Sequence, residues 1–154
     1  MDDDLSDQTE ALGRLIYDVL RTASNLTAAA DLLVKPLGLT SARWQVLAMV
    51  GFRDQPGTVS DLARSLSLTR QSVQRVVDDL TRDGMVAPAQ NPTHVRAHLI
   101  TVTDAGRGVL AAAEALRLPW TEALARQLTV HDTAAAEVLL QALQRALTAQ
   151  KPAD

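Results

Sequence analysis

The fold of this chain is decided by residues 58–84, which read TVSDLARSLSLTRQSVQRVVDDLTRDG. Hydroxyl side chains favour helix starts, because their oxygens accept hydrogen bonds from free backbone amides. Ser60 can therefore cap one helix over about residues 61–66, and Thr69 can cap another over about residues 70–82. The glycine that closes the stretch favours a stop. The stretch predicts two short helices joined by a tight turn.

The second of these helices has two different faces. At about 100° per residue, its three valines and Leu80 fall within an arc typical of a buried face. Thr69 and Ser72 can reach phosphates at the helix start. Arginine can bond guanine O6 and N7, and glutamine can pair with adenine N6 and N7 in the major groove. The face opposite the valines could therefore read bases in DNA, or it could simply be a solvated polar face. It carries Arg70, Gln71, Gln74, Arg75, Asp78 and Arg82.

Two short strands are expected next, over residues 85–90 and 98–102. Pro88 has no amide hydrogen to donate, so the first strand is expected at a sheet edge. A loop over residues 91–96 connects them and carries Arg96, where a wing would meet the narrow minor groove. The order helix, turn, helix, strand, loop, strand is typical of a helix-turn-helix followed by a β-wing. This order favours DNA contact over simple solvation.

Helices are expected on both sides of this module. Apolar residues recur every three or four positions over about residues 7–34, which predicts a long amphipathic helix. Thr40 can cap the next helix, whose expected inner face is Trp44, Leu47, Ala48 and Phe52.

After the strands, Thr103 can cap an alanine-rich helix, which Pro119 should kink or split. Thr129 and Asp132 resemble a capping box for a last helix ending near Ala149. The expected fold is mainly α with a small antiparallel β-wing. Its expected segments are an N-terminal arm and dimerisation helix (1–38), a winged helix-turn-helix (39–103) and C-terminal dimerisation helices (104–154).

Composition limits the class of protein. The chain has 47% hydrophobic residues, no cysteine, and no apolar run of the roughly 20 residues that a membrane helix needs. The start Met1-Asp2-Asp3-Asp4 is the opposite of a basic signal peptide. We therefore expect a cytoplasmic protein without a membrane partner. The whole chain has a net charge of −3. The first ten residues hold five acids and no bases, so the rest of the chain is weakly positive.

Residues 68–80, LTRQSVQRVVDDL, followed by Asp83-Gly84-Met85-Val86, resemble the recognition helix of the MarR family of transcriptional regulators. Residues 91–96 and 102–107 are similar to that family's wing and next helix. The resemblance implies a homodimer with interlocked terminal helices, bound to a pseudo-palindromic site with half-sites about 10 bp apart. It also implies repression relieved by a small, often aromatic ligand. The family's wing commonly has an acidic and a basic residue before the arginine, where this chain has His94 and Val95.

Other kinds of site have less support. His94 and His98 would lie about 13 Å apart on one strand, too far to share a metal ion. No catalytic constellation or glycine-rich phosphate loop is present, so neither an enzyme nor a cofactor is expected. A small-molecule effector could bind near Tyr17, Arg21 and Trp44; the alternative for Trp44 is a core or interface residue. Arg43 could likewise meet an anionic ligand or lie on the surface.

The predicted function is a ligand-responsive repressor that binds double-stranded DNA as a homodimer. The alternative is a winged-helix module for protein interaction without DNA binding, which the near-neutral charge and Val95 support. The terminal helices carry more apolar positions than the module alone can cover, and this supports the dimer. The predicted DNA-contacting residues are Thr69, Arg70, Gln71, Ser72, Gln74, Arg75 and Arg96.

Overall fold

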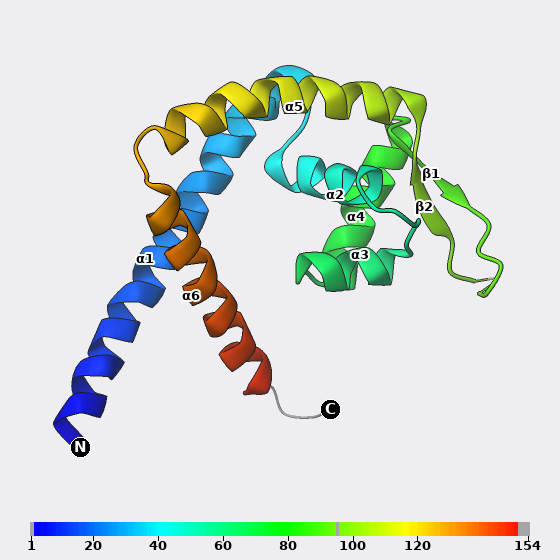
Figure 1. Cartoon of the computed structure of the whole chain (residues 1–154). Coiled ribbons are helices and arrows are strands. Elements are labelled where there is room, and N and C mark those ends of the chain that lie inside the picture. Colours follow the sequence, from blue (N-terminus) through cyan, green and yellow to red (C-terminus); the bar gives the residue numbers. More distant parts are fainter. Residues whose placement is uncertain (1, 95, 151–154) are drawn as a thin grey trace. The chain divides into compact units, whose positions relative to one another are not determined.

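The computed structural model describes residues 2–94 and 96–150, so Val95 of the expected wing lies outside the described residues. The chain divides into one unit that extends to Leu116 and a second that begins at Arg117. Most of the described chain is helical, and one two-stranded antiparallel sheet is present, which confirms the predicted fold class (Figure 1). None of the helices in the described part is both long enough and apolar enough to cross a membrane.

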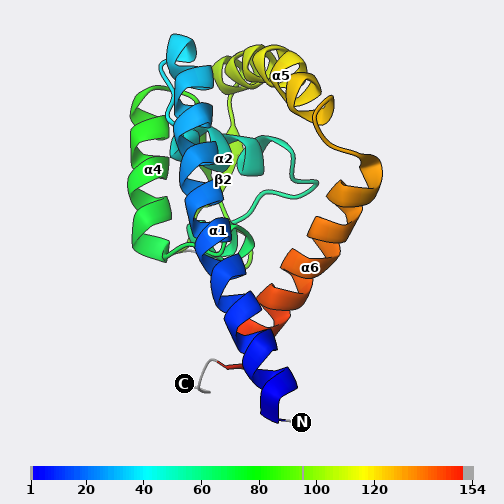
Figure 2. The ribbon, with the colours of Figure 1, turned by 90° about the vertical axis from the view of Figure 1, so that its left-hand side faces the viewer.

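The first helix, α1, runs over Asp2–Val34 and so begins earlier than the sequence pattern predicts. A 3-10 turn, η1 (Lys35–Leu37), follows and ends at Gly38 with a left-handed φ of 70°. In Figure 2 the N-terminal half of α1 extends beyond α2 and α4. Its side chains over residues 5–28 are exposed or only half-buried.

Helix α2 (Ser41–Gly51) begins at the predicted cap, since the Thr40 side chain accepts a hydrogen bond from the Arg43 amide. Its buried apolar side chains are Val46, Leu47 and Val50. The prediction that Phe52 lies on the inner face is wrong, because Phe52 is 64% exposed. It follows the last helical residue, so the helical periodicity no longer fixes its direction.

Helix α3 (Val59–Leu66) begins two residues earlier than predicted, and its cap is Thr58 rather than Ser60. Thr58 Oγ1 accepts a hydrogen bond from the Asp61 amide at 3.3 Å, and Asp61 Oδ2 accepts one from the Thr58 amide at 2.9 Å. This reciprocal capping box satisfies two amides that a helix start leaves free. The Thr58 hydrogen bonds lower the pKa of Asp61, with the backbone bond contributing most.

Removing this cap should destabilise the fold. We expect Thr58→Ala to lower the free energy of unfolding by about 1 kcal/mol. Because the folded pKa of Asp61 lies below its unfolded value near 3.8, its contribution is present above that pH and is lost as pH falls through the folded value. Urea denaturation at pH 7 and at acidic pH measures both effects. Ser60→Ala is the matched control and should change stability by less than about 0.5 kcal/mol; an equal loss would contradict the assignment.

Helix α4 (Arg70–Arg82) has the predicted start and stop, with Thr69 as N-cap and Gly84 at a left-handed φ of 73°. Strands β1 (Val86–Ala89) and β2 (Leu99–Val102) follow and pair in antiparallel fashion, with Pro88 opposite Ile100. Ile100 also forms a bridge with Gly57. At Ile100, strand β2 is therefore bonded on both sides, and β1, with its proline, is an edge strand as predicted.

The core of the first unit lies between these elements. Val73, Val77 and Leu80 of α4 pack against α2 and α3, and strand residues Val86 and Ile100 close the same cluster. Figure 1 shows α2, α3 and α4 together, with the hairpin beside them. This packing buries one face of α4 and leaves the opposite face accessible.

Helix α5 (Asp104–Ala125) begins after Thr103, whose Oγ1 accepts a hydrogen bond from the Gly106 amide at 3.0 Å. The helix continues through Pro119, so of the two predicted outcomes, a kink or a split, the split is wrong, and a kink stays a prediction. Only one helical hydrogen bond requires the missing proline amide, and alanine-rich flanks have a high helix propensity.

Helix α6 (Val130–Ala149) starts at the predicted capping box of Thr129 and Asp132. None of its described side chains is buried. Its exposed apolar residues include Val138 (65%), Leu139 (47%), Leu140 (42%) and Leu147 (58%).

Candidate nucleic-acid interface

The exposed face of α4 is built from the residues that the sequence predicted. With its valine face buried, helical geometry turns Arg70, Gln71, Gln74 and Arg75 outward. Together with Asp78 they line one shallow hollow on the surface. The side chains of Arg70, Gln71 and Arg75 form no hydrogen bond or ion pair with another described residue. Two guanidinium groups are thus available to a partner from outside the chain.

The two hydroxyl residues at the start of α4 are joined to each other. Thr69 Oγ1 accepts a hydrogen bond from the Ser72 amide at 3.1 Å and lies 2.7 Å from Ser72 Oγ. Both side chains are exposed. Their positions at the helix start fit the predicted phosphate contacts, where free amides and the positive helix end attract anions. The capping bond still leaves each hydroxyl with further hydrogen-bonding capacity.

The loop of the wing is closed by an asparagine. Asn91 Nδ2 donates to the Ala97 carbonyl at 2.9 Å, and Asn91 Oδ1 accepts a hydrogen bond from the Thr93 amide at 3.1 Å. Arg96 and His94 are exposed on this loop, and neither has an ion-pair partner among the described residues. The arginine therefore has no carboxylate partner among the described residues, although the family resemblance implies an acidic residue just before it.

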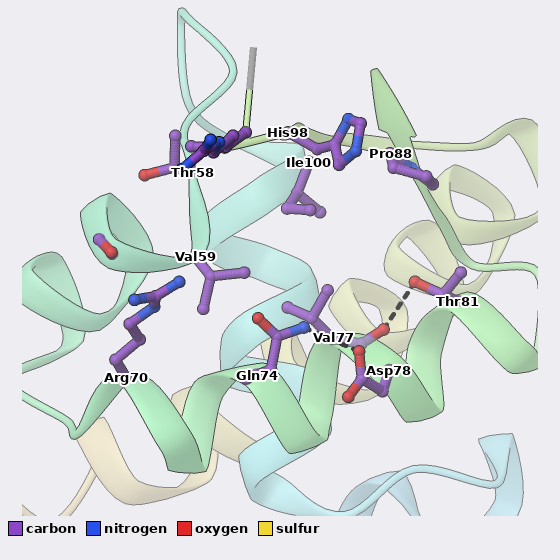
Figure 3. A pocket seen from close by; sticks show the side chains of 13 residues that line it. Thr58, Val59, Arg70, Gln74, Val77, Asp78, Thr81, Pro88, His98 and Ile100 are labelled. Carbon is purple, nitrogen blue, oxygen red and sulfur yellow. Dashed lines mark hydrogen bonds between the residues drawn. The ribbon is translucent and has the colours of Figure 1, made fainter. Parts of the chain in front are cut away.

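A cavity of about 250 Å³ lies between α4 and the wing (Figure 3). Arg70, Gln74 and Asp78 contribute from the helix, and Arg96 and His98 contribute from the wing side. Two guanidinium groups and one imidazole thus border one space. The structure brings Arg96 next to the exposed face of α4, although 26 positions separate it from Arg70 along the chain.

The position of α4 is fixed by a contact that sequence reasoning missed. Arg43, considered above as a possible ligand contact, forms an ion pair with Asp83 at the C-terminal end of α4. It also donates a hydrogen bond to the Gly38 carbonyl at 2.9 Å. Its side chain is only 19% exposed. Both terminal groups of this arginine are therefore engaged within the fold, linking the end of η1 to the end of the recognition helix.

The residues predicted for an effector pocket lie in different surroundings. Tyr17 is 77% exposed on α1. Arg21, one turn later, forms an ion pair with Asp18 at 2.8 Å. Trp44 on α2 is half-buried and packs against the core cluster. An effector site at these residues stays a prediction.

The fold and the exposed face of α4 define a winged helix-turn-helix protein. The sequence pattern of the MarR family matches residues 37–97. The chain is 34% identical to the uncharacterized protein Rv2011c of Mycobacterium tuberculosis over 143 residues, covering 93% of this chain and 96% of that one. The chain belongs to the MarR family of transcriptional regulators.

Two further comparisons concern regulators with described roles. The transcriptional activatory protein BadR of Rhodopseudomonas palustris is 31% identical over 65% of this chain and 58% of its own length. A crystal structure of a mutant MarR from E. coli complexed with operator DNA has a TM-score of 0.74 and 26% identity, and covers 86% of this chain and 92% of that one.

Proposed function

We propose that the chain is a sequence-specific, DNA-binding transcriptional regulator that inserts α4 into the major groove. The single observation that carries this proposal is the exposed cluster of Arg70, Gln74 and Arg75 on a helix whose other face is buried. Arginine and glutamine supply the hydrogen bonds that distinguish guanine and adenine edges. The similarity to the operator complex of MarR supports the same use of the fold.

We further propose that the wing adds a contact to the adjacent minor groove through Arg96. Its side chain is exposed and borders the cavity next to α4. Because no described carboxylate holds it in place, this contact should contribute less than those of α4. The predicted phosphate contacts of Thr69 and Ser72 would fix the register of the helix on the duplex.

A homodimer is the second part of the proposal. Within α1 and α6, large apolar side chains are exposed in a single chain, including Leu20 (64%), Leu32 (72%) and Val138 (65%). Apolar surface of this extent favours association with a matching surface. We assign residues 1–38 and 104–154 to dimerisation and residues 39–103 to DNA binding. Sedimentation velocity should give twice the mass of the 16.5 kDa chain.

The third part is a ligand-responsive repressor that acts in the cytoplasm. The family resemblance supports repression and relief by a small effector, and Tyr17, Arg21 and Trp44 are the proposed effector contacts. The similarity to BadR makes activation the alternative sign of regulation. Transcription in vitro from a promoter that carries the selected operator distinguishes the two, since repression requires that added protein lowers the transcript yield.

Selection from random duplex DNA with the purified protein tests DNA binding. We expect an enriched pseudo-palindrome with half-sites about 10 bp apart, because each protomer would present one α4 to successive major grooves. Affinity should fall steeply with salt, as phosphate contacts release counterions. If no site were enriched, the protein-interaction alternative would be favoured. The missing partner of Arg96 and the net charge of −3 are the observations that support that alternative.

A further inference from the structure

Asp78 places a negative charge on the proposed DNA face. It is exposed and lines the same hollow as Arg70, Gln74 and Arg75. A carboxylate next to DNA phosphates lowers affinity through charge repulsion. A role other than phosphate binding is therefore required if this residue contributes to recognition.

The structure gives Asp78 a side-chain partner one turn earlier in α4. Gln74 Nε2 donates a hydrogen bond to Asp78 Oδ1 at 2.8 Å (Figure 3). The spacing of four residues places both side chains on one helix face. An ionised carboxylate can only accept hydrogen bonds, so chemistry requires that the amide nitrogen of Gln74, rather than its oxygen, faces Asp78.

This hydrogen bond determines what Gln74 can offer to a base. The carbonyl oxygen and the second amide hydrogen stay free, and Figure 3 shows the oxygen on the side of Arg70. An acceptor beside a donor complements N6 and N7 of adenine in the major groove. A side chain that is ordered before binding also loses less freedom when the complex forms.

We propose that Asp78 is a positioning residue for base recognition, which orients the Gln74 amide to read an A·T pair. This inference rests on the proposed DNA-binding function. It differs from direct recognition, in which Asp78 would itself accept a hydrogen bond from cytosine N4. It also differs from a simple helix-stabilising pair, which would affect folding and leave base preference unchanged.

Selection from random duplex DNA should be carried out with the full-length protein and with Asp78→Ala, Asp78→Asn, Gln74→Ala and the Asp78→Ala/Gln74→Ala double variant. The unmodified protein should prefer A·T at one position of each half-site by about tenfold. Gln74→Ala should abolish that preference. Both Asp78 variants should reduce it at the same position, without weakening binding to unrelated duplex, because each removes a negative charge.

The double variant distinguishes an indirect role from a direct one. If Asp78 acts through Gln74, its replacement should have no further effect on base preference once Gln74 is alanine. Asp79→Ala is the matched control, because Asp79 carries the same charge one position later but bonds Arg82 at 2.7 Å. This control should keep the A·T preference. Circular dichroism should show the same helix content for all of these variants.

Four results would overturn the inference. Altered preference at a different base pair, or an effect of Asp78→Ala that persists without Gln74, would show direct recognition. If both Asp78 variants kept the A·T preference, the hydrogen bond between Gln74 and Asp78 would only stabilise the helix. If the unmodified protein selected no site, the proposed function would fail and the inference would fail with it. That outcome differs from the one in which the unmodified protein selects a site and the Asp78 variants select it with the same base preference.

Discussion

Replacing Gly106 by alanine should lower the free energy of unfolding by about 2–4 kcal/mol. A Cβ at this position would lie 2.0 Å from the Met85 carbonyl oxygen and 2.9 Å from Val102 Cγ2. The Met85 atom belongs to backbone that is itself fixed, since this carbonyl also accepts a hydrogen bond from the Thr103 amide at 3.1 Å. The start of α5 would have to move away from the strands. Urea denaturation followed by circular dichroism measures the loss.

Gly108 provides the matched control in the same helix. A Cβ at Gly108 would meet nothing within 4 Å. Alanine has a higher helix propensity than glycine, so Gly108→Ala should stabilise the protein by about 0.5–1 kcal/mol. The two substitutions are chemically identical and two residues apart, yet they should have opposite signs. A similar small effect from both would contradict the close approach of α5 to Met85.

The largest expected effect on DNA binding comes from Arg70→Ala, Gln74→Ala and Arg75→Ala combined. Each well-placed contact to a base edge contributes about 1–3 kcal/mol, and such contributions are not fully additive. We therefore expect operator affinity to fall by roughly 10²–10³-fold. All three side chains are exposed, so thermal stability should change little. Fluorescence anisotropy with the selected operator at fixed salt measures the loss.

Arg14→Ala combined with Arg126→Ala is the control for charge alone. Both arginines are exposed, and both lie outside the winged module. This variant also loses two positive charges, but it should retain operator affinity within about threefold, because neither arginine is among the residues proposed to contact DNA. Equal affinity of the triple variant and the unmodified protein would instead favour the protein-interaction alternative.

The sequence predicted the recognition helix well because its determinants are local. The cap at Thr69, the valine face and the stop at Gly84 all act within a few residues of α4. The same is true of the capping box at Thr129. The cap of α3 was misassigned because Thr58 and Ser60 are both suitable residues. The reciprocal Asp61 three residues after Thr58 was the signal that distinguishes them.

Contacts between distant residues could not be predicted in this way. The ion pair of Arg43 with Asp83 joins positions 40 apart, and nothing in either local pattern indicates it. The close approach of Gly106 to Met85 likewise depends on how α5 packs against the strands. The hydrogen bond between Gln74 and Asp78 was accessible from the sequence, since the spacing of four on a predicted helix places them together.

The apolar side chains exposed along α1 and α6 have a consequence for the cell. If they are covered only when two chains meet, the stability of the regulator depends on how many copies are present, by about 1.4 kcal/mol for each tenfold dilution. Where single chains predominate, halving the copy number lowers the amount of dimer about fourfold by mass action. Operator occupancy would then respond more steeply than linearly to the rate at which the chain is synthesised.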